Sequence, residues 1–83
     1  MTALQSEVLS WFAALPGARR AGTIGPETDL IETGVLDSLA ILNAIGFLET
    51  RFNIVVPVEA FTPDNFRTVR AMSDMVASLG GQS

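Results

Sequence analysis

Apolar residues recur near the start of the chain at the spacing of one face of an α-helix. Counted from the first of them, they fall at i, i+4, i+7, i+8 and i+11: Leu4, Val8, Trp11, Phe12 and Leu15. Pro16 and Gly17 follow at once, and neither residue type favours the continuation of a helix. The pattern therefore predicts a first helix over residues 3–15.

The same periodicity returns twice later in the chain. One stretch predicts a helix over residues 38–52, with an apolar stripe at Ile41, Ala44, Ile45, Leu48 and Phe52. Another predicts a helix over residues 69–79, with apolar residues at Val69, Met72, Val76 and Leu79. Thr68 is placed as the N-cap of this last helix and the Gly-Gly pair at 80–81 as its stop, so we expect residues 80–83 to form a short flexible tail.

The segment between these two helices carries the signals for one short helix. Thr62, Pro63 and Asp64 combine a capping hydroxyl, a proline at the first helical position and an acid in the first turn, which predicts a helix over residues 63–66. Residues 54–56 have strand-like composition, but the chain offers no second strand to pair with them. We therefore expect an all-α fold, a small four-helix bundle with three longer helices and one short one.

The first connection, residues 16–37, is long for a compact domain. Its 22 residues show no sustained apolar period. Its second half is nevertheless apolar at four positions: Leu30, Ile31, Val35 and Leu36. Gly34 supplies a turn among them. We expect this long loop to pack along the bundle and to bring Asp37 and Ser38 to the start of the second helix.

Composition narrows the chemistry that these elements can perform. The 83 residues suffice for one domain, residues 1–83, and they include no Cys, no His and no Lys. Disulfides, zinc sites built on Cys or His, and acid–base catalysis by imidazole are therefore excluded. The formal charge of −4, from 9 acids and 5 arginines, argues against nucleic-acid binding and favours partners with basic patches.

No segment has the length and charge pattern of an export signal or a membrane span. Residues 1–7 carry an acid and no positively charged side chain, unlike a secretory signal. The longest nearly apolar run, residues 39–48, has ten residues, about half of the roughly 20 that a membrane span needs. We expect a monomeric cytoplasmic protein that neither enters the membrane nor binds nucleic acid.

Asp37 and Ser38 have the most specific context in the chain. Either residue can cap the apolar helix that follows, and this structural role alone would explain a polar pair there. The long loop, the Gly34 turn and two apolar neighbours nevertheless converge on one hydroxyl at a helix N-terminus, where backbone N–H groups and the helix dipole favour a phosphate. Ser38 is therefore suited to carrying a phosphodiester.

At these residues the chain resembles the acyl carrier protein family, which includes the peptidyl carrier proteins. The resemblance rests on Asp37-Ser38-Leu39, on the Gly34 turn before this motif and on the helix end at residues 49–54 after it, and it extends over residues 4–79. It implies that Ser38 receives 4′-phosphopantetheine from coenzyme A through a separate phosphopantetheinyl transferase, with Asp37 as its neighbour in the signature. The thiol of this arm would then hold an acyl or aminoacyl group as a thioester.

The resemblance implies a carrier and not an enzyme, and Ser38 indeed has no His or Lys that could activate it as a nucleophile. It also implies a loading partner, an adenylating ligase or an acyltransferase, and downstream biosynthetic enzymes. Between Ser38 and Phe52 the only acid is Glu49, which departs from the acid-rich second helix of fatty-acid carriers. We therefore expect a freestanding carrier in a dedicated secondary-metabolic pathway, of the peptidyl, aminoacyl or polyketide type, the alternative being a domain of a larger enzyme.

Partner contacts are expected on the side of the second helix that faces away from the core. A rotation of about 100° per residue, with Ile41 at the centre of the buried side, places three predicted contact residues opposite and two on one shoulder. The predicted partner-binding residues are Leu39, Leu42, Asn43, Gly46 and Glu49. Phe47 falls at the border of the two faces, where we expect the long loop to cover it partly. The alternative is that the loop covers Leu39 as well and that the face is ordinary surface.

Two other hypotheses remain. Asp29, Glu32 and Asp37 could form a metal or acid–base site in principle, but their spacing matches no known ligand loop, and we interpret them as solvated loop charges and helix-start electrostatics. A carrier-like adaptor would bind a partner through the second helix without modification of Ser38. Such an adaptor would keep its function in the Ser38→Ala variant.

Overall fold

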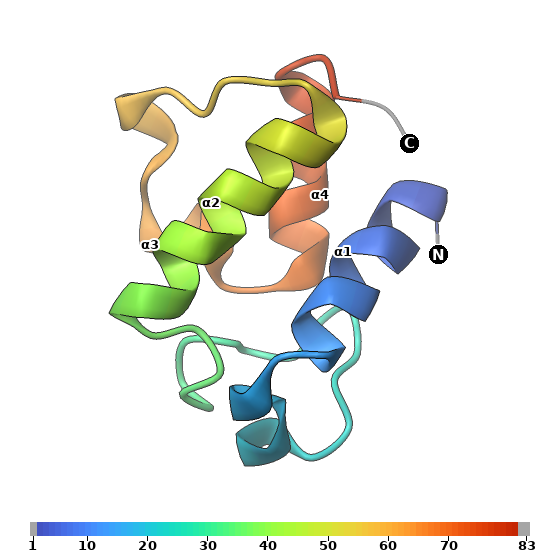
Figure 1. The fold of residues 1–83 in the computed structure, drawn as a ribbon, viewed down its shortest axis with the longest axis vertical. Coiled ribbons are helices and arrows are strands. Elements are labelled where there is room, and N and C mark those ends of the chain that lie inside the picture. Colours follow the sequence, from blue (N-terminus) through green and yellow to red (C-terminus); the bar gives the residue numbers. More distant parts are fainter. Residues whose placement is uncertain (1, 82–83) are drawn as a thin grey trace.

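The computed structural model describes residues 2–81, which contain four α-helices and no strand, and it confirms the predicted all-α fold. The helices are α1 (Ala3–Ala13), α2 (Ser38–Phe52), α3 (Pro63–Phe66) and α4 (Val69–Ser78). Figure 1 shows α1, α2 and α4 inclined to one another around a shared interior, with the first connection passing beneath them. The N-terminal end of α2 lies beside this connection.

Two helices end earlier than their apolar patterns suggested. α1 ends at Ala13 and not at residue 15, because Leu15 precedes Pro16 and takes the extended conformation (φ −70°, ψ 145°) that a residue before proline prefers. α4 ends at Ser78, one residue before the predicted end. α2 and α3 run over the same residues that the sequence pattern indicated.

The two glycines after α4 form a packed helix stop, which corrects the expectation of a flexible tail from residue 80. Gly80 has a φ of 91°, in the left-handed region that ends many helices. Gly81 is buried, and its N–H donates to the Val76 carbonyl at 2.9 Å. A Cβ on Gly81 would clash with Val76 and press against Ile54. Residues 82–83 of the expected tail lie outside the described residues.

The connections contain more regular structure than the sequence indicated. Pro16–Ala21 form a 3-10 helix, η1, and Val58–Ala60 form a second one, η2, before α3. Neither is long enough to show an apolar period, which is why the pattern did not reveal them. Further along the first connection Leu30, Val35 and Leu36 are buried, so this loop packs along the bundle and leads to α2 as predicted.

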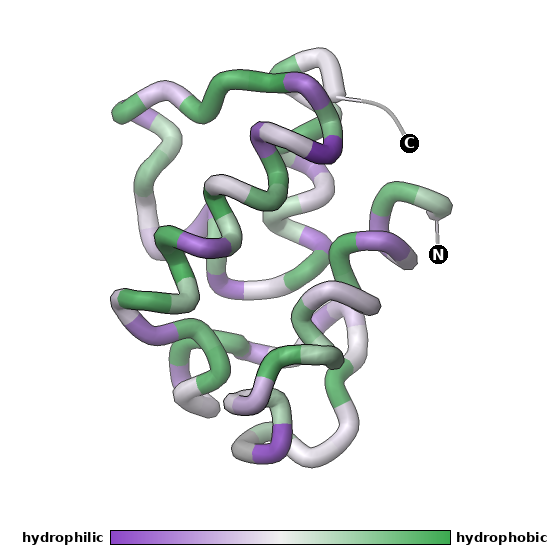
Figure 2. Tube along the Cα trace, in the orientation of Figure 1, coloured by the Kyte–Doolittle hydropathy of each residue, from purple (hydrophilic) through white to green (hydrophobic). Residues whose placement is uncertain are grey.

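The core takes side chains from every helix and from the first connection. Its fully buried members include Val8, Phe12, Leu30, Leu48, Phe66, Val69, Met72 and Val76. Figure 2 shows apolar stretches recurring along the longer helices and the first connection. The buried side of α2 is centred on Ala44 and Leu48, whereas Ile41, which the sequence analysis placed at its centre, is only half-buried. Among residues 2–81, no helix combines the length and the apolar character that a membrane span requires.

Phe47 is half-buried, but α1 covers it and not the long loop, contrary to the expectation from the sequence. Its ring stacks on the Trp11 ring, with centroids 4.9 Å apart and an interplanar angle of 11°. It also meets Phe52 edge-to-face at 5.9 Å, and Trp11 meets Phe12 in the same way at 4.9 Å. Of these contacts, the Trp11–Phe47 stack joins the two helices and holds α1 against the C-terminal half of α2.

We expect Gly81→Ala to destabilise the fold by about 1–3 kcal/mol, the usual range for overpacking a filled site. The added methyl group has no space because Val76 and Ile54 already fill the position. Gly46→Ala is the matched control, since nothing lies within 4 Å of a Cβ there and alanine is favoured over glycine by about 1 kcal/mol in a helix interior. Chemical denaturation followed by circular dichroism measures both, and a Gly81→Ala protein as stable as the parent would contradict this packing.

Candidate functional site

The first turn of α2 presents Ser38 at the surface. Asp37 is the N-cap, and its Oδ1 accepts a hydrogen bond from the Ala40 N–H at 2.8 Å. The Asp37 carbonyl accepts from the Ile41 N–H at 2.9 Å. Ser38 is the first residue of the helix and is exposed. Of the two residues that could cap this helix, Asp37 does so, and Ser38 keeps a surface position next to it.

Main-chain hydrogen bonds fix the loop that leads to this turn. The Leu30 N–H donates to the Arg67 carbonyl at 2.7 Å, and the Leu30 carbonyl accepts from the Leu36 N–H at 2.8 Å. The Arg70 N–H donates to the Pro26 carbonyl at 3.0 Å. The bonds to Arg67 and Arg70 therefore attach the first connection to the α3–α4 region. The bond between Leu30 and Leu36 closes a turn within the connection, immediately before α2.

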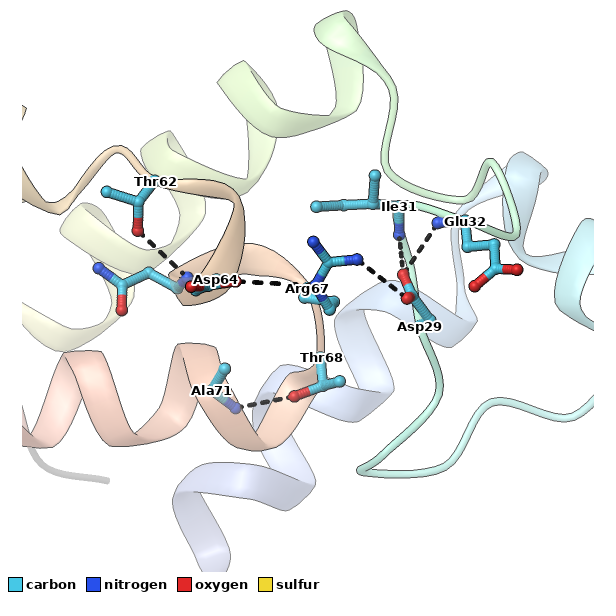
Figure 3. A network of polar contacts seen from close by, with 9 residues as sticks. Asp29, Ile31, Glu32, Thr62, Asp64, Arg67, Thr68 and Ala71 are labelled. Atoms are coloured by element: carbon cyan, nitrogen blue, oxygen red, sulfur yellow. Dashed lines mark hydrogen bonds and ion pairs between the residues drawn. The ribbon is translucent and has the colours of Figure 1, made fainter.

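Asp29 links the same loop to Arg67 through its side chain (Figure 3). Its Oδ1 accepts from the N–H groups of Ile31 at 3.1 Å and Glu32 at 2.9 Å, and its Oδ2 accepts from Arg67 Nη1 at 3.1 Å. The Glu32 N–H, and after it the Arg67 guanidinium, hold the pKa of Asp29 below its usual value, while desolvation opposes them. Asp29 is thus a structural tether and not simply a solvated loop charge. Among residues 2–81, no group of three or more His, Cys, Asp and Glu residues is placed to hold a metal ion.

A hollow of about 500 Å³ opens directly beside Ser38. Its walls come from the first connection, from α2 and from the segment that leads into α3. The lining residues are Ile31, Leu36, Asp37, Ser38, Ile41, Phe61, Thr62 and Pro63. The site therefore combines one exposed hydroxyl with a mainly apolar concave surface.

Ile31 and Phe61 are site residues that the sequence analysis did not identify. Phe61 is 48% exposed and Ile31 is 37% exposed, which is unusual for side chains of their size. Both lie outside the four α-helices, so no helical period could mark them. Phe61 meets the buried Phe66 edge-to-face at 6.5 Å, which fixes its place on the wall of the hollow.

A second, smaller hollow of about 250 Å³ adjoins the same turn of α2. Leu39 and Asn43, which line it, point away from Ile41 on a helix with about 100° per residue, so the two hollows lie on different sides of α2. Its other wall is the junction of α1 and η1, at Pro16 and Gly17. The start of α2 is thus accessible from two directions.

The residues predicted to bind partners mostly lie on the surface of α2. Leu39 is 70% exposed and Leu42 is 67% exposed, and Asn43 and Gly46 are also exposed. The first connection therefore does not cover Leu39. These four residues form one open strip along the helix, which we call the α2 strip, and their contact with partners stays a prediction.

Glu49 differs from the other predicted partner-binding residues, because its carboxylate already has a partner within the fold. Its Oε2 accepts a hydrogen bond from the Val56 N–H at 2.9 Å, and the residue is half-buried. Asn53 ends α2 in the left-handed conformation, with a φ of 55°, so that the chain turns back toward Glu49. Glu49 therefore anchors the segment between α2 and α3, a role that the helical wheel did not reveal.

The sequence profile of the family described as "Phosphopantetheine attachment site" matches residues 7–76, most of the chain. The chain belongs to this family. It is thus a carrier protein, and its cofactor is 4′-phosphopantetheine bound covalently. The resemblance to carrier proteins inferred from the sequence is confirmed.

Individual carrier proteins are similar to this one in sequence and in fold. D-alanyl carrier proteins of Streptococcus suis and Streptococcus pyogenes are 40% and 42% identical to it over 53 residues, which cover 64% of this chain and 67% of those proteins. The fold matches a chain in the crystal structure of Bradyrhizobium japonicum glycine:[carrier protein] ligase complexed with its cognate carrier protein and an analogue of glycyl adenylate. That match has a TM-score of 0.67 and 26% identity, and it covers 90% of this chain and 92% of the other.

We expect Asp29→Asn to weaken the acid sensitivity of the fold. The pKa of Asp29 in the folded protein lies below its usual value of 3.8, so the ionised carboxylate stabilises the fold above that value. This contribution is lost as the pH falls through the folded-state pKa. Denaturation from pH 7 to acid should therefore show the parent more stable than Asp29→Asn at neutral pH, with the two curves converging below about pH 4.

Asp64→Asn is the control for this series, because Asp64 lies 3.9 Å from the same arginine but its side chain is 94% exposed. The free energy of unfolding of Asp64→Asn, plotted against pH, should run parallel to that of the parent. A constant difference between parent and Asp29→Asn at every pH would show that the tether does not depend on the ionised carboxylate.

Proposed function

We propose that Ser38 is the residue that carries the 4′-phosphopantetheine arm. Three serines lie within the matched residues 7–76: Ser10, Ser38 and Ser73. Ser73 is buried and donates its hydroxyl to the Val69 carbonyl at 2.8 Å, so a modifying enzyme cannot reach it. Ser10 is exposed but lies within α1. Of the three, Ser38 combines exposure with a helix N-terminus, and this observation carries the proposal.

The surroundings of Ser38 suit the chemistry of this arm. N–H groups and the dipole at the start of a helix favour the phosphate that would be attached there. The Asp37 carboxylate, which would repel a phosphate, is turned toward the Ala40 N–H. The apolar walls of the adjacent hollow, at Ile31, Ile41 and Phe61, would seat the nonpolar part of the arm.

The chain presents the hydroxyl but contributes no base to its modification. It contains no His and no Lys, and the nearest carboxylate, that of Asp37, is used as a helix cap. An unactivated hydroxyl is a weak nucleophile. The phosphopantetheinyl transferase must therefore take up the proton of Ser38 and bind coenzyme A, while the capped end of α2 holds Ser38 in place.

We further propose that the arm carries an aminoacyl group as a thioester and that an adenylating ligase loads it. The similarity to D-alanyl carrier proteins and the fold match to a chain from a glycine ligase complex support this choice over an acyltransferase. The matched chain is similar in size to this one, as expected of a carrier and not of a ligase. Neither comparison supports the secondary-metabolic setting expected from the sequence, which stays a prediction together with the cytoplasmic location and the freestanding state.

The α2 strip is the surface through which we propose that the ligase, the transferase and downstream enzymes contact the protein. It adjoins Ser38, and its large side chains, Leu39 and Leu42, are the most exposed apolar residues of α2. None of the four strip residues is acidic. The Glu49 carboxylate, which accepts from the Val56 N–H, is the one acid of α2, and its contact with partners stays a prediction. Recognition should accordingly depend on apolar contact more than on charge.

Incubation with coenzyme A and a broad-specificity phosphopantetheinyl transferase should add the mass of one arm to the parent protein. Ser38→Ala should gain no mass, because the attachment oxygen is gone. Ser10→Ala is the matched control and should be modified like the parent, since its serine lies within α1. Intact-protein mass spectrometry measures all three.

Two outcomes would contradict the assignment of Ser38. Modification of Ser38→Ala would place the arm on another residue. An unmodified parent, with the transferase active on a known carrier in the same tube, would favour the adaptor hypothesis.

The protein isolated from its own cell should carry the mass of the arm plus a small aminoacyl group. Hydroxylamine should release that group, because it cleaves thioesters, and leave the arm in place. Mass spectrometry before and after the treatment measures the cargo directly. A mass that corresponds to a long-chain acyl or polyketide group would contradict the aminoacyl proposal without affecting the assignment of Ser38.

A further inference from the structure

A third hollow, of about 480 Å³, lies between α1 and the C-terminal half of α2. Its lining residues are Ser6, Glu7, Ser10, Trp11, Phe47 and Arg51. At a rise of 1.5 Å per residue, Phe47 lies about 14 Å along α2 from Ser38. The hollow is therefore separate from the site proposed for the arm.

Two aromatic rings form one side of this hollow. Trp11 and Phe47 are stacked at 4.9 Å and nearly parallel, and both are half-buried, so part of this aromatic pair remains at the surface. The faces of aromatic rings attract cations, and those of tryptophan attract them most strongly. The hollow therefore offers an apolar surface that favours a positively charged group.

Glu7 adds a carboxylate whose hydrogen bonding is incomplete. Its Oε1 accepts from Arg51 Nη2, whereas Oε2 is buried and accepts no hydrogen bond within residues 2–81. A buried carboxylate oxygen without a donor is unfavourable. The Arg51 side chain is 46% exposed, and its guanidinium also lies over the Phe52 ring, with Cζ 5.2 Å from the centroid. Exposed ion pairs contribute little to stability, so a second donor at Glu7 would compete with Arg51 at a small cost.

We propose that this hollow binds an arginine side chain of a partner protein. A guanidinium is planar and can stack on Trp11, and its five N–H groups can replace Arg51 at Glu7 Oε1 and donate to the hydroxyls of Ser6 and Ser10. An ammonium group is compact and cannot make both kinds of contact at once. The net charge of −4 favours a cationic partner as well. A partner seated here would leave Ser38 uncovered.

Titration of the unmodified 83-residue chain with N-acetyl-arginine methylamide tests the proposal. Trp11 is the only tryptophan, so its indole N–H gives one resolved signal in a ¹⁵N–¹H spectrum. We expect saturable, millimolar binding that shifts this signal together with the amides of Phe47 and Arg51. Glu7→Gln should weaken the binding several-fold, while Glu59→Gln, which removes the same charge from an exposed residue of η2, should bind like the parent.

Matched probes decide the chemistry of the occupant. N-acetyl-citrulline methylamide keeps the shape of arginine without its charge, and N-acetyl-lysine methylamide keeps the charge without the planar group; both should bind several-fold more weakly. Equal binding of either probe, or unchanged binding by a folded Glu7→Gln protein, would overturn the proposal. Because the chain is unmodified in this experiment, its result does not bear on the assignment of Ser38.

Discussion

The burial of Leu30 sets the position of the segment that leads into α2. The side chain is fully buried in the core, and the main chain of the same residue pairs with Arg67 on one side and Leu36 on the other. Burial of a leucine side chain contributes about 1.5–3 kcal/mol, and a buried peptide group cannot leave its partners without a further cost. The long connection is therefore held at its middle, and the short segment from Leu30 to Asp37 has little freedom in where it delivers the start of α2.

The charged side chains serve this geometry more than they serve global stability. Exposed ion pairs such as Arg70–Glu27 contribute between about 0 and 1 kcal/mol each. The carboxylates with well-defined roles are those that accept main-chain N–H groups: Asp29 in the loop, Asp37 at the start of α2 and Glu49 near its end. These acids fix the two connections that flank α2. Because α2 itself contains a single acid, Glu49, the acidic excess of the chain does not form a charged recognition face on that helix.

The sequence predicted those features that depend on residues close together in the chain. The helix starts at Ser38 and Pro63 follow from capping residues that act within one turn, and the apolar period indicated the core side of the longer helices. The walls of the hollow beside Ser38 could not be predicted in this way. Ile31 and Phe61 come from irregular segments 30 residues apart, and it is tertiary packing, next to the buried Leu30 and Phe66, that brings them to one hollow. The same holds for Phe47, whose cover depends on where α1 packs.

Exposure of apolar side chains around Ser38 is consistent with contacts that form and break repeatedly. Burying Leu39, Leu42 and Phe61 within the fold would have stabilised it, yet the two leucines remain largely open to solvent and Phe61 is about half exposed. A carrier that is loaded by one enzyme and unloaded by another must leave each of them, so no single contact can be large. A few exposed apolar residues next to a mainly apolar hollow give each partner a small area to cover, and a small area permits fast release. The Asp37 cap at the start of α2 then keeps Ser38 in one position for each partner, although every contact is brief.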